Sequence, residues 1–526
     1  MTSYIRRHRT VWAAAGFAVL AAAPAGAQDS TAKVPVKQLA PVEARATRGL
    51  GAVSSLRALP DGSIFVNDNQ RRQLLRFDAS LKDVRIIADT APGAPLPYGQ
   101  RPAGLLSYLG DSTIIVDPAT TSLVVLNPQG KVARIMAPPR TNDINLLAMT
   151  NLGSNAFDSN GQLVYRQGNS GGGPGMAAMF GSGNDRGGRG GGQPGQQGRG
   201  GQPGQQGRGG DAGGRGDFGG GGFGGGPGGF GGGPGGRGNV GASQPDSVPV
   251  VRVNFDTRKA DSVTWLKVPK NETAMTRGED GSMRMTVKIN PLPQGDDWAL
   301  LSDGTIAVVR VLDYHVDYYT ADGQRTSSPR LPFDWKRISD DEKVKMVDSL
   351  KTLAKVAADR AAQGGNQAFR MNIEVVAPEK LPDYYPPIRA GSTLADRDGN
   401  LWILPTTSNL SAQLAQSMMG GGGRGGFGGG PPGGAGGAPG AGRAPGDSAG
   451  RGGRGGADAM SAMVPGMMTA MMAPLVYDVV NRKGELAYRV QLPAGRQIVG
   501  FGPNGTVYLA AREGREVFVE KTRLVN

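Results

Sequence analysis

A phrase of two strands joined by a tight turn recurs six times in this chain and constrains its fold more than any other feature. The first copy, at 54–68, has an apolar run, a turn at Pro60-Asp61-Gly62 and a second apolar run. Glycine at such a turn supplies the positive φ that a tight hairpin needs, and short apolar runs between turns are typical of strands. The six copies are Ser54–Asp68, Gly104–Pro118, Ser154–Gln167, Asp297–Arg310, Gly391–Pro405 and Arg496–Ala511.

The second half of each copy predicts a third strand, and most copies continue into a fourth. Examples are Leu74–Ser80 followed by Val84–Ala88. Four antiparallel strands repeated about every 40 residues are typical of a β-propeller blade. One blade cannot bury both of its faces alone, so blades stack in a ring. We therefore predict an all-β, six-bladed propeller, and we expect Gln38–Arg45 to complete the sixth blade and close the ring.

The recurring phrase resembles that of the NHL-like six-bladed propellers. The likeness consists of a strand, a turn such as PDG, SDG, RDGN or PNG, and strands like IFVND and RFDAS, and it covers roughly 49–526 apart from the insertions. The resemblance implies the closed ring. It implies no particular activity, because this fold hosts many activities.

The first 27 residues have the pattern of a secretory signal peptide. Arg6, Arg7 and Arg9 precede an apolar stretch at Val11–Ala23, and Ala25-Gly26-Ala27 forms a small-residue cleavage signal. We expect cleavage before Gln28, a propeller over 28–526, a periplasmic or secreted location, and no stable membrane insertion after cleavage. An N-terminal membrane anchor and twin-arginine export are the alternatives.

Three insertions interrupt the repeat. The glycine-rich segments 168–245 and 419–458 cannot bury enough apolar surface to order themselves, so we expect them to be disordered. Their RGG-like runs are typical of RNA-binding tails, but export argues against a nucleic-acid partner. The third insertion, 332–387, predicts a helix over Ser339–Ala362 that covers blades four and five as a lid. Second-to-third-strand loops and blade-to-blade connections leave a blade on one side, so all three insertions should decorate one face.

Little in the sequence supports catalysis. His315 is the one histidine of the mature chain and there is no cysteine, so a Ser-His-Asp triad, thiol chemistry and a multi-histidine zinc site have no basis. We predict no catalytic residue, no metal and no cofactor. Three alternatives stay open: copper at the methionines of 460–472, calcium at 396–400, and a hydrolase or lyase whose paired carboxylates lie about 5–9 Å apart in the central channel.

Aromatic residues and arginines gather on the predicted decorated face. Such pairs suit anionic or glycan ligands. The net charge of +14 agrees with an anionic partner. We predict a non-enzymatic scaffold that recognises a protein, a peptide or an anionic glycan there. The alternative is that the aromatics belong to the blade cores and the arginines brace strand ends. The candidate residues are Arg166, Arg310, Trp335, Tyr384, Tyr385, Arg389, Arg496 and Arg512, with Asp296 and Asp297.

Overall fold

The computed structural model describes residues 34–149, 154–168, 245–269, 272–277, 283–363, 369–408, 473–514 and 516–525. The predicted signal peptide, most of both glycine-rich insertions and the methionine cluster at 460–472 lie outside these residues. No helix in the described ranges is both long enough and apolar enough to cross a membrane.

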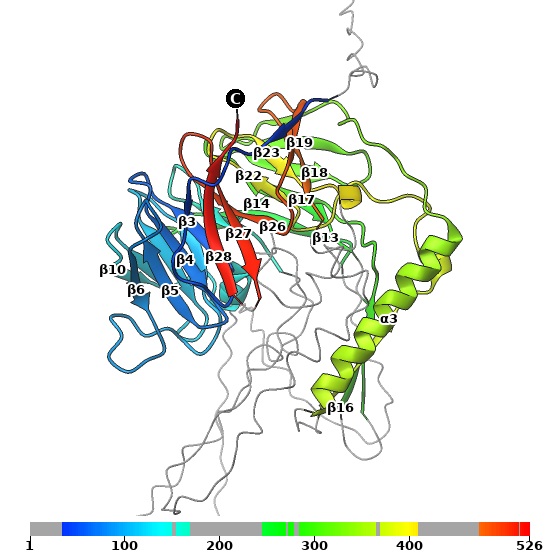
Figure 1. Ribbon diagram of the computed structural model, residues 1–526, viewed down its shortest axis with the longest axis horizontal. Coiled ribbons are helices and arrows are strands. Elements are labelled where there is room, and N and C mark those ends of the chain that lie inside the picture. The colour runs from blue at the N-terminus through cyan, green and yellow to red at the C-terminus, as the bar shows by residue number, and fades with distance from the viewer. Residues whose placement is uncertain are drawn as a thin grey trace, which may run out of the picture.

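Six antiparallel sheets form the blades of a propeller, as the repeat predicted (Figure 1). In each sheet the strand that opens a copy of the phrase lies at one edge, and the later strands follow outward in chain order. From the inner strand outward, blade one consists of β3 (Ser55–Ala58), β4 (Ile64–Asp68), β5 (Gln73–Phe77) and β6 (Val84–Ala88), and blade two of β7 (Gly104–Ser107), β8 (Thr113–Asp117), β9 (Ser122–Leu126) and β10 (Val132–Met136). Blade three consists of β11 (Ala156–Phe157), β12 (Leu163–Arg166), β13 (Ser247–Val253) and β14 (Ala260–Lys267), and blade four of β17 (Asp297–Leu300), β18 (Ile306–Arg310), β19 (His315–Tyr319) and β20 (Arg325–Ser327). Blade five consists of β22 (Thr393–Ala395), β23 (Leu401–Ile403), β24 (Val476–Val480) and β25 (Leu486–Gln491), and blade six of β26 (Arg496–Phe501), β27 (Thr506–Glu513) and β28 (Glu516–Arg523).

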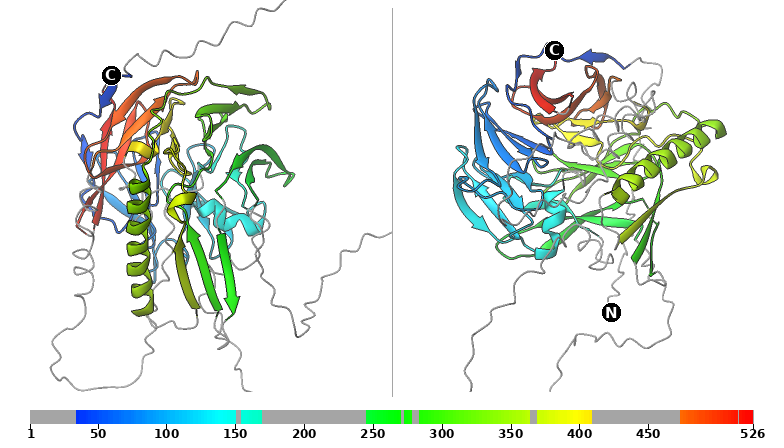
Figure 2. Two further views of the ribbon diagram at one scale, coloured as in Figure 1. Left: turned by 90° about the vertical axis from the view of Figure 1, so that its right-hand side faces the viewer. Right: turned by 60° about the horizontal axis from the view of Figure 1, so that its bottom comes forward.

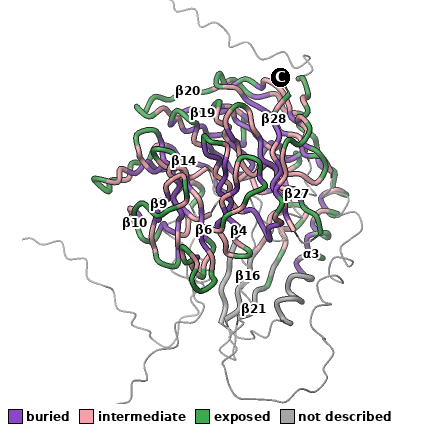
Figure 3. The backbone as a smooth tube through the Cα atoms, turned by 60° about the vertical axis from the view of Figure 1, so that its left-hand side comes forward, coloured by how far each residue is buried: buried purple, intermediate pink, exposed green. Residues whose placement is uncertain are grey.

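The core lies between the blades. Successive side chains of a strand point to opposite faces of its sheet. In β4, Ile64 and Val66 therefore pack toward blade six, in a cluster with Val519, while Phe65 packs toward blade two, in a cluster with Ile115. Four further clusters join blades two and three, three and four, four and five, and five and six, so the contacts close a circle (Figure 2). Buried backbone follows the blade strands, and exposed backbone follows the turns (Figure 3).

The N-terminal segment joins the last two blades. β2 (Ala44–Arg45) pairs antiparallel with β28 and is the outer strand of blade six, as predicted. β1 (Val36–Gln38), which the sequence did not predict, pairs parallel with β25 and adds a fifth strand to blade five. A single bridge between Leu39 and Leu524 connects the two pairings. The segment therefore ties blade five to blade six from outside.

A small α/β unit stands outside the ring. The hairpin of β15 (Glu272–Arg277) and β16 (Met283–Ile289) comes from the connection between blades three and four, and β21 (Phe369–Val375) comes from the next connection and pairs parallel with β16. α3 (Asp340–Gln363) contacts β21 and runs alongside this sheet (Figure 2, left). The remaining short helices are η1 (Thr141–Asp143), α1 (Ile144–Ala148), η3 (Pro378–Lys380) and η4 (Thr406–Ser408).

The helix begins where the sequence indicated. The Ser339 hydroxyl accepts a bond from the Glu342 amide at 3.2 Å, and the Glu342 carboxylate accepts one from the Ser339 amide at 2.9 Å, which is a capping box. Its surroundings differ from the expectation, because its neighbours are β21 and η3 rather than the faces of blades four and five. The insertion is thus half of an α/β unit, whose other half is a hairpin that the repeat analysis did not identify.

Candidate functional site

A cavity of about 480 Å³ occupies the centre of the ring. Its lining comes from the inner strands β3, β7, β11, β17, β22 and β26, one from each blade. Each of these strands has a neighbour in its sheet on one side only, so backbone polar groups of the other edge face the channel. Cavities of this size hold small-molecule ligands in other proteins. The central channel is therefore the place where a compact ligand would meet all six blades.

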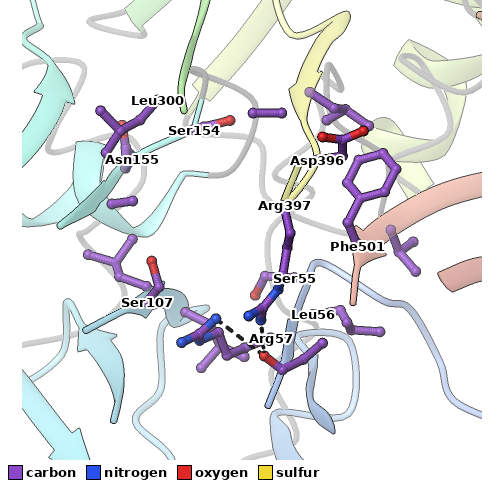
Figure 4. Close-up of a pocket in the computed structure, with 18 of the residues that line it drawn as sticks. Ser55, Leu56, Arg57, Ser107, Ser154, Asn155, Leu300, Asp396, Arg397 and Phe501 are labelled. Carbon is purple, nitrogen blue, oxygen red and sulfur yellow. Dashed lines mark hydrogen bonds between the residues drawn. The ribbon is translucent and has the colours of Figure 1, made fainter. Parts of the chain in front are cut away.

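Two arginines, Arg57 of β3 and Arg397 in the turn after β22, converge in this cavity (Figure 4). Arg57 Nη1 donates to the carbonyl oxygen of Ala58 at 3.2 Å, and Arg397 Nη2 donates to the same oxygen. No carboxylate of the described residues lies within ion-pair distance of either guanidinium. Arg57 Nε is buried without a hydrogen-bond partner. The carbonyl oxygen of Ala58 thus accepts hydrogen bonds from two positively charged groups.

The electrostatics of the pair agree with this geometry. Burial and, to a smaller extent, the nearby charge of Arg397 together lower the pKa of Arg57 to about 10, against a weaker opposing effect of Asp111. Burial also lowers the pKa of Arg397, which Asp111 and Tyr508 oppose. Both groups stay charged near neutral pH, so the cavity holds two incompletely compensated positive charges.

The two carboxylates in the cavity lining are already engaged. Asp158 Oδ2 lies 3.2 Å from Arg252 Nε in a buried ion pair but makes no hydrogen bond, and Asp158 Oδ1 accepts bonds from its own turn. Asp396 accepts hydrogen bonds from the indole of Trp402 at 3.0 Å and from the side chain and the amide of Asn400. In the described part of the chain no three His, Cys, Asp or Glu side chains gather as a metal ligand set. Among the described residues that line the channel, both carboxylates therefore already have a charged or hydrogen-bonding partner.

Two of the predicted ligand residues form a brace between blades three and four. Arg310 lies 2.8 Å from Asp296 and 2.7 Å from Asp317, and it also donates to the Trp265 carbonyl at 2.8 Å. Asp296 in turn accepts from the amides of Lys267 and Val311. These contacts agree with the bracing alternative for Arg310 and Asp296, and neither residue lines the central cavity.

The two predicted arginines of blade six lie in different surroundings. Arg496 makes a bidentate pair with Glu520, with distances of 3.0 and 3.1 Å, and so holds the inner strand to the third strand of its own blade. This contact agrees with the bracing alternative for Arg496. Arg512 is exposed at the far end of β27. Neither lines the cavity.

Arg166 ends β12 of blade three, Asp297 opens β17 of blade four, and Arg389 precedes β22 of blade five. Asp297 is fully buried and accepts the Thr393 amide at 2.7 Å, which ties blade four to the start of blade five. Burial raises the pKa of Asp297, whereas burial lowers the pKa of Arg166, an effect that Asp297 opposes. Burial lowers the pKa of Arg389 to about 10. Asp297 thus interacts with Arg166 of blade three and with the Thr393 amide of blade five.

The predicted aromatics lie at the base of the α/β unit. Trp335 and Tyr384 are 45% and 48% exposed, on two segments joined by a bridge between Arg337 and Tyr384. Tyr385 is buried in a small core with Leu292 and Ile338. None of the ten predicted residues lines the central cavity, and the structure divides them among these separate places. An arginine inside an inner strand, as in SSLRALPDG, is the sequence signal that would have pointed to Arg57.

Comparisons with known proteins give no further argument about this chain. No family model matches the chain, and no curated protein matches it. Among solved structures, it is similar to virginiamycin B lyase from Staphylococcus aureus, with 8% identity over 91% of this chain and 98% of that one and a TM-score of 0.32. It is also similar to a gluconolactonase from Xanthomonas campestris, with 7% identity, 94% and 96% coverage and a TM-score of 0.32.

A third similar structure is the PQQ-bound aldose sugar dehydrogenase from Streptomyces coelicolor, with 11% identity, 92% and 97% coverage and a TM-score of 0.33. These values carry no argument about activity. The six-bladed architecture rests on the strand pairing and on the contacts between blades.

Proposed function

We propose that this protein is a binding propeller that takes an anionic ligand into its central channel, with the anion held between Arg57 and Arg397. The single observation that carries the proposal is the convergence of these two guanidinium groups on the Ala58 carbonyl, inside a cavity of about 480 Å³. A carboxylate suits a pair of guanidinium groups, since each can donate two parallel hydrogen bonds to it.

The proposed ligand belongs to the class of partner predicted from the sequence, but the proposed site is the central channel and not the decorated face. A peptide carboxylate or an acidic glycan carries the required charge, but the described contacts favour the channel over the decorated face. Export through the segment 1–27 and kinship with NHL-like propellers remain proposals from the sequence. The binding role is favoured over a hydrolase or lyase because the two carboxylates of the described lining have partners: Asp158 pairs with Arg252, and Asp396 accepts from Trp402.

The test is a binding titration with two small probes, benzoate and phenyl phosphate. Replacing Arg57 or Arg397 with glutamine should weaken binding of either probe about 10-fold or more, because each variant removes a charge-assisted hydrogen bond. The double variant should show no measurable binding. Arg330→Gln is the control, since that side chain is 78% exposed and pairs with Asp313 away from the channel. Unchanged binding in the double variant would overturn the proposal.

The same variants should remain folded. A cation whose pKa is lowered by folding destabilises the folded state at every pH at which it is charged, so removing the Arg57 charge removes that cost. Arg397 still donates to the Ala58 carbonyl in Arg57→Gln. We expect a thermal midpoint at least as high as that of the unmodified protein, which separates loss of binding from loss of fold.

A further inference from the structure

Arg397 reaches the channel from a hairpin turn of blade five, and its side chain runs toward Arg57 of blade one (Figure 4). The turn connects β22 and β23: the Gly399 amide donates to the Asp396 carbonyl at 3.4 Å, and Gly399 has a φ of 82°. A turn that ends on a left-handed glycine is a common hairpin connection. Its backbone sets where the long Arg397 side chain begins, so the position of the guanidinium depends on what holds the turn.

Asp396 holds this turn to its own blade. Its Oδ1 accepts the amides of Asp398 and Asn400 at 2.9 and 2.8 Å, and its Oδ2 accepts from the Asn400 side chain at 2.8 Å and from the Trp402 indole at 3.0 Å. All four donors lie in blade five. These bonds therefore shape the turn but do not place it relative to the rest of the ring.

Arg482, in the turn between β24 and β25, supplies that second attachment. Its Nε donates to the Asp398 carbonyl at 2.8 Å, and its Nη2 donates at 3.3 Å to the hydroxyl of Ser302, which lies in the hairpin turn between β17 and β18 of blade four. Its Nη1 lies 3.8 Å from Asp303 in the same turn. One guanidinium thus ties the turn that carries Arg397 to the outer half of blade five and to blade four.

The fit of this guanidinium is close, although it lies outside the channel. It rests on Gly399, where a Cβ would come 2.7 Å from Arg482 Nη2 and closer still to Nε. The Arg482 side chain is 53% exposed and does not line the cavity. Arg482 therefore has no contact with the position of the ligand, and any effect on binding must pass through the turn.

We infer that Arg482 is a positioning residue of the anion site, which holds the turn 396–399 so that Arg397 meets Arg57 at the Ala58 carbonyl. The inference rests on the proposed function. Arg397 and Arg57 belong to blades five and one, with blade six between them, so their meeting depends on where each backbone is held. Binding groups act together only when they are held within about 0.5 Å of their places.

The experiment is a benzoate titration of Arg482→Gln. This variant should bind about 3-fold more weakly than the unmodified protein, because the turn loses a hydrogen bond that fixes it. Gly399→Ala keeps Arg482 but displaces its guanidinium, so it should act in the same direction. The matched control is Arg258→Gln, which should bind normally. Arg258 also joins two blades, through the carbonyls of Ala137 and Pro138 at 3.2 and 3.0 Å, and has no contact with the turn.

A double-variant comparison separates positioning from the loss of a positive charge and from a general loss of stability. Arg482→Gln should weaken binding by the same factor in the Arg57→Gln background, but should have no further effect in the Arg397→Gln background. A simple charge effect, or a destabilised fold, would lower binding in both backgrounds.

Two kinds of failure can be told apart. If Arg482→Gln binds benzoate as the unmodified protein does, or weakens binding equally in both backgrounds, while Arg397→Gln alone loses affinity, Arg482 does not position Arg397 and the proposed function stands. If Arg397→Gln binds normally, or if benzoate does not bind the unmodified protein, the proposed site is wrong and the inference is wrong with it.

Discussion

Asp317→Asn is expected to lower the free energy of unfolding by about 3 kcal/mol, because it removes the shared acceptor of a buried ionic cluster. Asp317 has a side chain that is 1% exposed, and it accepts from Arg310 Nε at 2.7 Å, from Arg325 Nη2 at 3.1 Å and from the Ser327 hydroxyl at 2.6 Å. These bonds hold the second, third and fourth strands of blade four together. Urea denaturation at pH 7 measures the loss.

The pH dependence gives this prediction a second, independent readout. Burial opposes ionisation of Asp317, but the bonds from Ser327, Arg310 and Arg325 outweigh it and lower the pKa to about 2 from 3.8. A carboxylate whose pKa is lower in the folded state stabilises that state at pH values above its pKa in the unfolded chain. This contribution to stability is lost as the pH falls through the folded-state pKa. The difference between the two proteins should therefore shrink by about 2 kcal/mol between pH 3.8 and pH 2.

The matched control is Asp313→Asn, which breaks an ion pair between side chains that are both exposed. Its effect should stay below about 1 kcal/mol. A loss in Asp317→Asn no larger than the loss in this control would contradict the assignment of Asp317 as the central acceptor of blade four.

A chain that begins at Thr47 is expected to be destabilised by on the order of 3 kcal/mol, because it loses the strand that closes the ring. The amides of Ala40, Glu43 and Ala46 donate at 2.8 Å to the carbonyls of Arg523, Lys521 and Val519. Each such bond contributes about 1 kcal/mol net. Ala46 is also buried in the cluster between blades one and six. Without this segment the outer edge of β28 is open, and open strand edges promote association.

Two further N-terminal truncations show which strand accounts for the loss of stability. One that begins at Val34 keeps both β1 and β2 and should be as stable as the full chain, and one that begins at Leu39 loses only β1 and should fall between. Chemical denaturation and light scattering measure stability and association, and a peptide of residues 34–50 added in trans should restore both. A stable, monomeric chain beginning at Thr47 would show that ring closure does not depend on this segment.

Local sequence predicted the blades well, because each blade is formed from residues close in the chain. The turn Pro60-Asp61-Gly62 is an example: Gly62 has φ of 82°, and the Asp61 carboxylate accepts the Ser63 amide at 2.9 Å. The number of blades, the hairpin turns and the closing strand β2 are confirmed. The start of α3 was predictable for the same reason, since a capping box lies within four residues.

Elements that pair across insertions were not predictable in this way. β16 and β21 come from different connections and pair in parallel, with Met283 opposite Phe369. Neither belongs to a copy of the repeated phrase, so alignment of the copies gave no sign of them. The partners of the candidate arginines were unpredictable for a related reason. Whether Arg310 or Arg496 is free for a ligand depends on its partners, and Asp296, Asp317 and Glu520 become neighbours only in the folded blades.

The sequence by itself determined that six similar sheets would form, since alternating apolar strands and glycine turns act over a few residues. Only the tertiary structure decided which charges meet in the centre. Arg397 and Ala58 are 339 positions apart and come together because closure of the ring brings blades one and five to the same channel. The candidate site is a product of that closure: burial inside the ring removes water from two arginines and lowers the pKa of both.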